Sequence, residues 1–293
     1  MIYLFFIFLI SPLIAQDDLL DILDEDSDKS VFVEFSFKGT RVVNAQSLEI
    51  PRPKILQFMI QHRFGSIENG SYDLFGMDYA TIRFDFQYGL TERLSFGVGR
   101  SSLDKIYDVF LKTKLLRQTS GSKSFPFSVL FYSDIGVDTK RKTENDPAVK
   151  DNYLNRLLFV NQLIIGRKFS RNLSLEILPT LIHRNLTPTK DDDHDLASIG
   201  IAGRYKLSNR ISVNADYFTP LGDRNNDYKN SIAIGVDYET GGHVFQVMIA
   251  NAQGPYEYTF IENASGNFST GTLYLGFNIS RAFTLASDNE KLW

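Results

Sequence analysis

Four histidines are the side chains of this sequence best suited to metal or acid–base chemistry. They are His62, His183, His194 and His243, and the chain has no cysteine. None stands at a metal-ligand spacing from another, and no Ser lies in a pattern that predicts a His and an orienting group beside it. The sequence therefore predicts no catalytic residue, no metal site and no cofactor. We therefore rank an enzyme third, below two non-enzymatic functions.

Two acidic segments come nearest to a cation site. Residues 191–195, DDDHD, gather carboxylates of the kind that hard cations prefer, but a solvated acidic loop is the favoured interpretation. Residues 223–227, DRNND, resemble the start of a calcium loop, yet Tyr228 stands where such a loop needs Gly. Neither segment is assigned as a metal site.

Charged residues that alternate with large apolar ones are more informative. In residues 82–88, Arg83 and Asp85 share one face, while Phe84 and Phe86 share the other. Successive side chains of a strand point to opposite sides, so this pattern predicts a strand between a polar and an apolar medium. The same parity places nine charged side chains on polar faces: Arg83, Asp85, Lys112, Lys114, Glu176, Arg204, Lys206, Asp216 and Asp237.

Twelve stretches are predicted to be the strands that carry these charges. One of them, 156–169, alternates poorly because Asn161 falls on its apolar face, and we expect a bulge or a shifted register there. The stretches are 55–65, 82–88, 94–99, 106–117, 126–137, 156–169, 173–184, 199–206, 211–217, 232–238, 243–252 and 272–279.

The connections between these stretches alternate between tight turns and long polar loops. Three of the turns nearly repeat one sequence: GLTERLSF, KFSRNLSL and KLSNRISV. Short turns on one side and long loops on the other are typical of periplasmic turns and extracellular loops. Two connections are exceptions, a short one at 102–105 and a longish one at 118–125. The sequence predicts an all-β, antiparallel transmembrane β-barrel of about 12 strands.

The ends of the chain fit this location. Residues 1–15, MIYLFFIFLISPLIA, are too short for a membrane-spanning helix and resemble a cleaved signal peptide. We expect export to the outer membrane of a Gram-negative bacterium. The predicted organisation is a signal peptide at 1–15, an acidic flexible leader at 16–30, a pre-barrel segment at 31–54, the barrel at 55–283 and a tail at 284–293.

The charge of the chain lies mainly in its leader. The formal net charge is -4, but residues 17–30 hold seven acids and one Lys, so the remainder is slightly basic. No basic block suggests nucleic acid. The leader is either disordered or able to dock a periplasmic partner through residues 17–30. The other expected partners are outer-membrane lipid and, during biogenesis, the barrel-assembly machinery.

Several stretches resemble one known family. They are FKGTRVVN (37–44), HRFG (62–65), LFGMDYATIRFDFQYGLTERL (74–94) and GRSSLDKIYDVFLKTKLLRQ (99–118). They are similar to an uncharacterised outer-membrane β-barrel family of Bacteroidetes, domain of unknown function 5777. The resemblance implies a single barrel in the outer membrane, and it implies no activity or functional residue.

Two functions follow from the polar inner face. In a water-filled lumen the nine charges would act on small polar solutes, as in a narrow pore or passive transporter. In a closed lumen they would cross-link the walls of a structural barrel that acts through its loops or its leader. The segment 31–54 is either a periplasmic tether or a plug folded into the lumen, and the sequence leaves both alternatives open.

Overall fold

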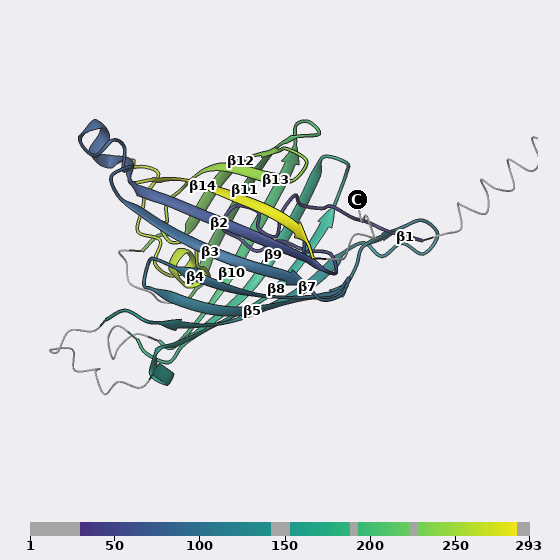
Figure 1. Ribbon diagram of the computed structural model, residues 1–293, viewed down its shortest axis with the longest axis horizontal. Helices are drawn as coiled ribbons and strands as arrows, with labels where there is room; N and C mark the ends of the chain where they lie inside the picture. Colours follow the sequence, from purple (N-terminus) through teal and green to yellow (C-terminus); the bar gives the residue numbers. More distant parts are fainter. Residues whose placement is uncertain (1–29, 142–152, 188–192, 223–227, 286–293) are drawn as a thin grey trace, which may run out of the picture.

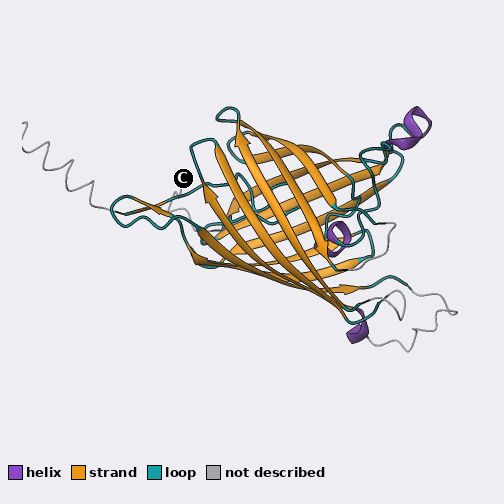
Figure 2. Cartoon of the chain, turned by 180° about the vertical axis from the view of Figure 1, so that it is seen from behind, coloured by secondary structure: helices purple, strands orange, loops and turns teal. Residues whose placement is uncertain are grey.

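The chain forms a closed antiparallel barrel, which confirms the predicted fold class (Figures 1 and 2). The computed structural model describes residues 30–141, 153–187, 193–222 and 228–285. The last strand pairs with the first barrel strand and closes the sheet. The twelve strands are β2 (Ile55–Ser66), β3 (Ala80–Gly89), β4 (Leu94–Ser101), β5 (Ile106–Leu116), β7 (Ser128–Asp138), β8 (Leu157–Lys168), β9 (Leu173–Arg184), β10 (Asp195–Lys206), β11 (Ile211–Leu221), β12 (Ser231–Glu239), β13 (His243–Ala250) and β14 (Tyr274–Thr284).

The connections sort to the two ends as the loop lengths predict. At one end, here called the short-turn end, lie the tight turns and a small sheet in which β1 (Val31–Phe32) pairs with β6 (Thr119–Ser120). The opposite, long-loop end carries η1 (Ile67–Asp73), η2 (Tyr153–Arg156) and the short helix α2 (Glu257–Ile261) (Figure 1). Among the described residues, no helix is long and apolar enough to cross a membrane.

The near-repeated turn sequence has a shared hydrogen-bond pattern. The amides of Leu90, Phe169 and Leu207 each donate to the carbonyl oxygen four residues ahead, at 2.9–3.0 Å. In the first copy, the Thr91 hydroxyl also accepts from the Arg93 amide at 3.1 Å, and a Ser does the same in the other two. A Ser or Thr at this place satisfies a turn amide that strand pairing leaves free.

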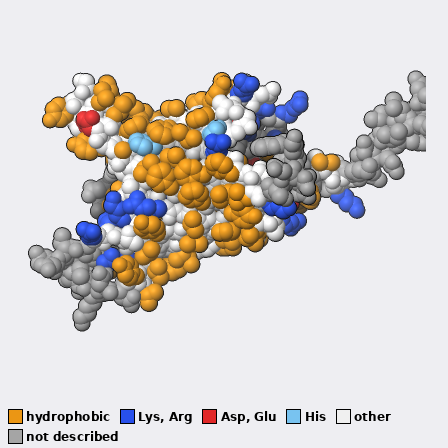
Figure 3. Space-filling model, viewed as in Figure 1, with side chains coloured by type: hydrophobic (Ala, Val, Ile, Leu, Met, Phe, Trp, Pro, Cys, Tyr) orange, Lys and Arg blue, Asp and Glu red, His pale blue; other side chains and the backbone are white. Residues whose placement is uncertain are grey.

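The outer wall is apolar at the positions that parity predicts. In β3, Arg83 and Asp85 are buried, whereas Phe86 is 43% exposed on the outside. Val247 on β13 is 68% exposed, and similar aliphatic and aromatic side chains cover much of the visible wall between the two ends (Figure 3). An apolar band around a closed barrel is what the hydrocarbon interior of a membrane requires.

The prediction of a bulge or a shifted register at Asn161 is wrong. β8 keeps an unbroken register with β7, and Asn161 points outward, where the Ser133 hydroxyl donates to its side-chain oxygen at 2.8 Å. The alternation is poor because the inner face of β8 is also largely apolar, with Val160 and Ile164 fully buried. These inward side chains belong to an apolar core that lies inside the lumen, so the lumen is filled by the chain itself.

Candidate functional site: the occupied lumen

Residues 36–50, here called the plug, lie inside the barrel. Phe37, Val43 and Ala45 are at most 1% exposed. The segment folds as a small hairpin in which the Val42 amide donates to Ala45 at 2.9 Å and the Ser47 amide donates to the Thr40 carbonyl at 3.0 Å. Of the two alternatives for 31–54, the structure has a plug at 36–50, and residues 30–35 lead into it from the short-turn end (Figure 1).

Lys112 on β5 holds the backbone of the plug. Its ammonium group is fully buried and donates to the carbonyl oxygens of Thr40 at 2.7 Å, Ser47 at 3.2 Å and Glu49 at 3.3 Å. A hairpin of this size leaves several backbone groups without partners of its own. The three donors of one ammonium group satisfy three of those carbonyls in a place that water does not reach.

Asp216 on β11 contacts the tip of the plug. One of its carboxylate oxygens accepts from the amides of Asn44 at 2.7 Å and Ala45 at 3.0 Å. On another side of the wall, Arg63 of β2 donates to the Asn44 side-chain oxygen at 2.8 Å. The tip is therefore fixed by an anion and a cation that belong to different strands.

Amide side chains of the wall complete this polar socket. Gln246 on β13 donates to the Val42 carbonyl at 2.7 Å and also to Asp237 at 2.6 Å. Asn278 on β14 donates to the Val43 carbonyl at 3.1 Å. The wall thus supplies donors for the plug's carbonyls from two adjacent strands, β13 and β14, and Asp237 of β12 accepts from one of these donors.

The long-loop end is closed by residues 251–264, here called the inner loop, which contain α2. Tyr256 and Phe260 are fully buried, and the Phe260 ring meets Phe218 of β11 edge-on with centroids 5.3 Å apart. The Tyr256 hydroxyl donates to Asp134 of β7. Burial, and then the nearby carboxylate of Asp134, raise the pKa of the Tyr256 phenol well above its ordinary value, so that it stays a donor.

A buried ion pair joins the inner loop to the plug. Glu257 of α2 accepts from the Arg41 guanidinium at 2.9 Å and from the Gln46 side chain at 2.7 Å. Arg41 and Glu257 have side-chain exposures of 3% and 0%. Because a buried charge is costly without its partner, each closure of the lumen depends on the position of the other.

The nine charged residues predicted to face the lumen lie beside the inner loop, around the plug or at the short-turn end. Arg83 makes a bidentate pair with Asp108 of β5 and lies 3.8 Å from Asp85, beside the inner loop. Around the plug, Glu176 neighbours Lys112 and Leu48, and Arg204 donates to the Ser36 carbonyl at 3.4 Å. Asp216 and Asp237 belong to the socket already described. Lys114 and Lys206 are half-buried at the short-turn end.

The sequence analysis did not predict several residues that contact the plug, the inner loop or the predicted charges. Arg63, Asp108 and Asp134 lie on the inward parity of their strands, so the alternation alone carried a signal for them. Arg41 and Glu257 carried none, because they belong to segments whose entry into the lumen has no periodic sequence pattern.

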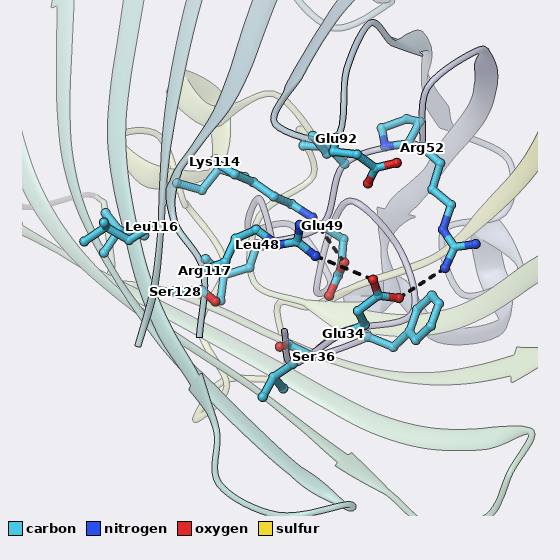
Figure 4. A pocket seen from close by; sticks show the side chains of 16 residues that line it. Glu34, Ser36, Leu48, Glu49, Arg52, Glu92, Lys114, Leu116, Arg117 and Ser128 are labelled. Carbon is cyan, nitrogen blue, oxygen red and sulfur yellow. Dashed lines mark hydrogen bonds and ion pairs between the residues drawn. The ribbon is translucent and has the colours of Figure 1, made fainter. Parts of the chain in front are cut away.

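A small pocket of about 70 Å³ remains between the plug and the wall at the short-turn end (Figure 4). Glu34 lies between two cations there, 3.1 Å from Arg52 and 3.5 Å from Arg117. Lys114 reaches toward Glu49 across 4.0 Å. Paired charged side chains therefore surround the position at which the chain enters the barrel.

All four histidines lie within the described residues, whereas the two acidic segments are only partly described. His62 stacks on Phe277 at 4.8 Å, and His183 contacts Asp195 at 2.7 Å. Residues 191, 192 and 223–227 lie outside the described residues, so the two acidic segments are not described as wholes.

An apolar outer wall closed into a ring of antiparallel strands defines a membrane β-barrel. The chain belongs to the family described as membrane bound beta barrel domain (DUF5777), whose model matches residues 37–283. The match begins inside the plug, so it covers residues of the plug as well as the wall.

Solved porins and channels have similar folds. The NanC porin is 10% identical, with 78% of this chain and 98% of that one covered and a TM-score of 0.48. The KdgM porin is 8% identical, with coverages of 77% and 99% and a TM-score of 0.47. The COG4313 outer membrane channel from Pseudomonas putida F1 is 13% identical, with coverages of 80% and 97% and a TM-score of 0.47. No curated protein sequence matches the chain.

Proposed function

We propose that the protein is an outer-membrane channel for small polar solutes that its own N-terminal plug closes at rest. It is exported to the outer membrane of a Gram-negative bacterium through the cleaved signal peptide 1–15 and has no catalytic role. The observation that carries the proposal is the polar socket. Lys112, Asp216 and Gln246 bind the plug through its backbone, and they would present polar groups to the lumen once the plug left.

A polar socket suits a removable plug better than an apolar one does. Hydrogen bonds between plug and wall can be exchanged for hydrogen bonds to water, so their net contribution is about 1 kcal/mol each. Apolar side chains such as Phe37 and Leu48 add to the holding energy, because their surface returns to water when the plug leaves. The plug is therefore held firmly but not irreversibly.

Single-channel conductance tests this proposal. The full-length protein in planar bilayers should be silent. A variant that lacks residues 17–51 but keeps Pro53 and Lys54, which contact Gly89 in the wall, should give discrete conductance steps. Heat-modifiable migration on gels controls for a folded barrel. A folded variant that stays silent would contradict the proposal that the plug alone closes the lumen at rest.

The inner-wall charges give a second readout in the same assay. In the plug-free protein, neutralising Lys112, Lys114, Arg204 and Lys206 together should shift the ion selectivity toward cations. Removing fixed positive charge lowers the local anion concentration. Unchanged selectivity would show that current does not pass these residues.

The second candidate is a closed structural barrel, and the inner loop favours it. Tyr256 and Phe260 are fully buried at the long-loop end and belong to a segment other than the plug. If the plug-free protein is silent, and removing α2 from that protein still yields no conductance, the barrel acts through its surface loops or through the leader 17–30.

A further inference from the structure

An apolar groove of about 460 Å³ crosses the outer wall on the side formed by β3 to β8. Val98, Val109 and Ile135 line it from the central strands β4, β5 and β7, and each is between 45% and 59% exposed. Phe86 of β3 and Leu157 of β8 line it from the flanking strands. A hollow with such a lining, placed in the apolar band of a membrane barrel, fits an acyl chain.

One cation lies at the head of this groove. Arg100, close to the long-loop end of β4, also lines it and is half-buried. Its guanidinium donates to the Tyr107 hydroxyl at 3.3 Å and lies 5.5 Å from the centre of that ring. No carboxylate pairs with Arg100 among the described residues. A charged side chain on the lipid face is costly at mid-membrane and is tolerated where polar headgroups begin.

The connection that follows Arg100 carries a second cation, Lys105, whose side chain is exposed. The loop 102–105 is unusually short for this end, and Asp104 and Lys105 both adopt left-handed backbone conformations, with φ of 57° and 53°. Asp104 pairs with Lys140 at 2.6 Å, and the Thr139 hydroxyl donates to the Lys105 carbonyl at 2.6 Å. The acid of this turn is thus neutralised by Lys140.

The tight turn leaves Lys105 with a fixed backbone and, within the described chain, no carboxylate partner. Left-handed conformations of two consecutive non-glycine residues are strained, and they persist where the surroundings hold them in place. Lys and Arg side chains gather at this end of the wall, next to the apolar surface (Figure 3). A short loop also leaves the groove open from the long-loop end.

From these observations we propose that the groove binds a phosphorylated lipid of the leaflet at the long-loop end. An acyl chain lies against Val98 and Val109, and a phosphate group lies between Arg100 and Lys105. The charge complementarity selects an anionic headgroup, and the apolar lining selects a lipid rather than a free phosphate. The site lies on the outside of the barrel, so it does not depend on whether the plug moves.

Native mass spectrometry in a neutral detergent tests the proposal with three probes. The probes are a diphosphorylated lipid A, the same lipid with its phosphates removed, and inorganic pyrophosphate. The wild-type protein should retain the phosphorylated lipid and neither of the other two. Equal retention of the dephosphorylated lipid would overturn the phosphate contact, and equal retention of pyrophosphate would overturn the groove.

Two variants separate the two halves of the site. Arg100→Gln with Lys105→Gln should weaken retention about 30-fold, because each cation near an anionic lipid surface contributes roughly a factor of five. Val109→Trp should weaken it while leaving both cations, because the indole fills the groove. Lys123→Gln with Arg171→Gln, at the short-turn end, is the matched control and should retain the lipid as the wild type does. Equal loss in this control would mean nonspecific attraction and would overturn the site.

Discussion

The plug and the inner loop close the same lumen with different chemistry. The plug is bound mainly through its backbone, by charged and amide side chains such as Lys112 and Asp216. The inner loop is bound mainly through its side chains, by aromatic contacts such as Phe260 on Phe218 and by the Tyr256 hydroxyl. Hydrogen bonds between the plug and the wall can be replaced by hydrogen bonds to water, whereas the contacts of a packed aromatic cluster cannot.

The plug and the inner loop also differ in how the chain connects them to the barrel. The plug is continuous with β2 through Lys54, and on its other side the chain is held only by the two-residue strand β1, which pairs with β6 at the short-turn end. The inner loop is tied on both sides, by β13 and β14. One closure can therefore leave the lumen, and the other can only rearrange within it. We infer that the plug is the moving part and the inner loop a fixed constriction.

The strongest test of this comparison is Lys112→Met. The change leaves three buried plug carbonyls without a donor and, since each unsatisfied group costs about 1–3 kcal/mol, should weaken plug docking by about 3 kcal/mol or more. The chain has no cysteine, so Val43→Cys supplies a single reporter thiol at a fully buried plug position. Maleimide labelling of that thiol should rise roughly a hundredfold or more, because the labelling rate follows the undocked population.

Lys123→Met is the control for that experiment. It removes an exposed Lys near the short-turn end, outside the socket, and should leave the labelling rate of Val43→Cys unchanged. If Lys112→Met labels no faster than this control, the plug is held by its apolar residues and the contrast with the inner loop is wrong.

Phe260→Ala tests the other half of the comparison. Truncating this fully buried ring should destabilise the inner loop by about 3 kcal/mol. Limited proteolysis should then cut near residues 251–264, while the labelling of Val43→Cys rises far less than in Lys112→Met. Equal exposure of the plug would mean that the two closures form one cooperative unit.

The wall could be predicted from the sequence because its rule is local. Alternation is a property of neighbouring residues, and it put Arg83 and Asp85 on the inner face of β3 before any pairing was known. The turn sequences around Thr91, Ser170 and Ser208 set the strand ends in the same way, since each hydroxyl binds an amide two residues ahead.

The contents of the lumen could not be predicted in this way. Residues 36–50 alternate poorly because their partners lie on β5, β11 and β13, far away in the sequence. The same cause misled the prediction at Asn161. A wall that faces a filled lumen takes apolar residues on both sides, so Val160 and Ile164 removed the polar signal that marks an inner face.

Glu257→Gln tests the link between the two closures. The variant removes the charge that Arg41 faces but keeps an oxygen for its hydrogen bond, so we expect a loss of about 2 kcal/mol. In combination with Lys112→Met, which releases the plug from the wall, the two changes should cost less than their sum, since both weaken the docking of the plug. Fully additive losses in thermal unfolding would show that the ion pair does not couple the plug to the inner loop.

Asp216→Asn should have the smallest effect and separates charge from hydrogen bonding at the plug tip. The amide oxygen of Asn can still accept from the amides of Asn44 and Ala45, so the loss should be about 1 kcal/mol, or roughly fivefold in the labelling of Val43→Cys. Asp216→Leu, which keeps the volume but has no acceptor, should label several times faster than Asp216→Asn. If the two variants label equally fast, the negative charge holds the tip and the hydrogen bonds do not. The plug would then be an electrostatic closure, and the contrast with the inner loop would be one of charge rather than of backbone hydrogen bonding.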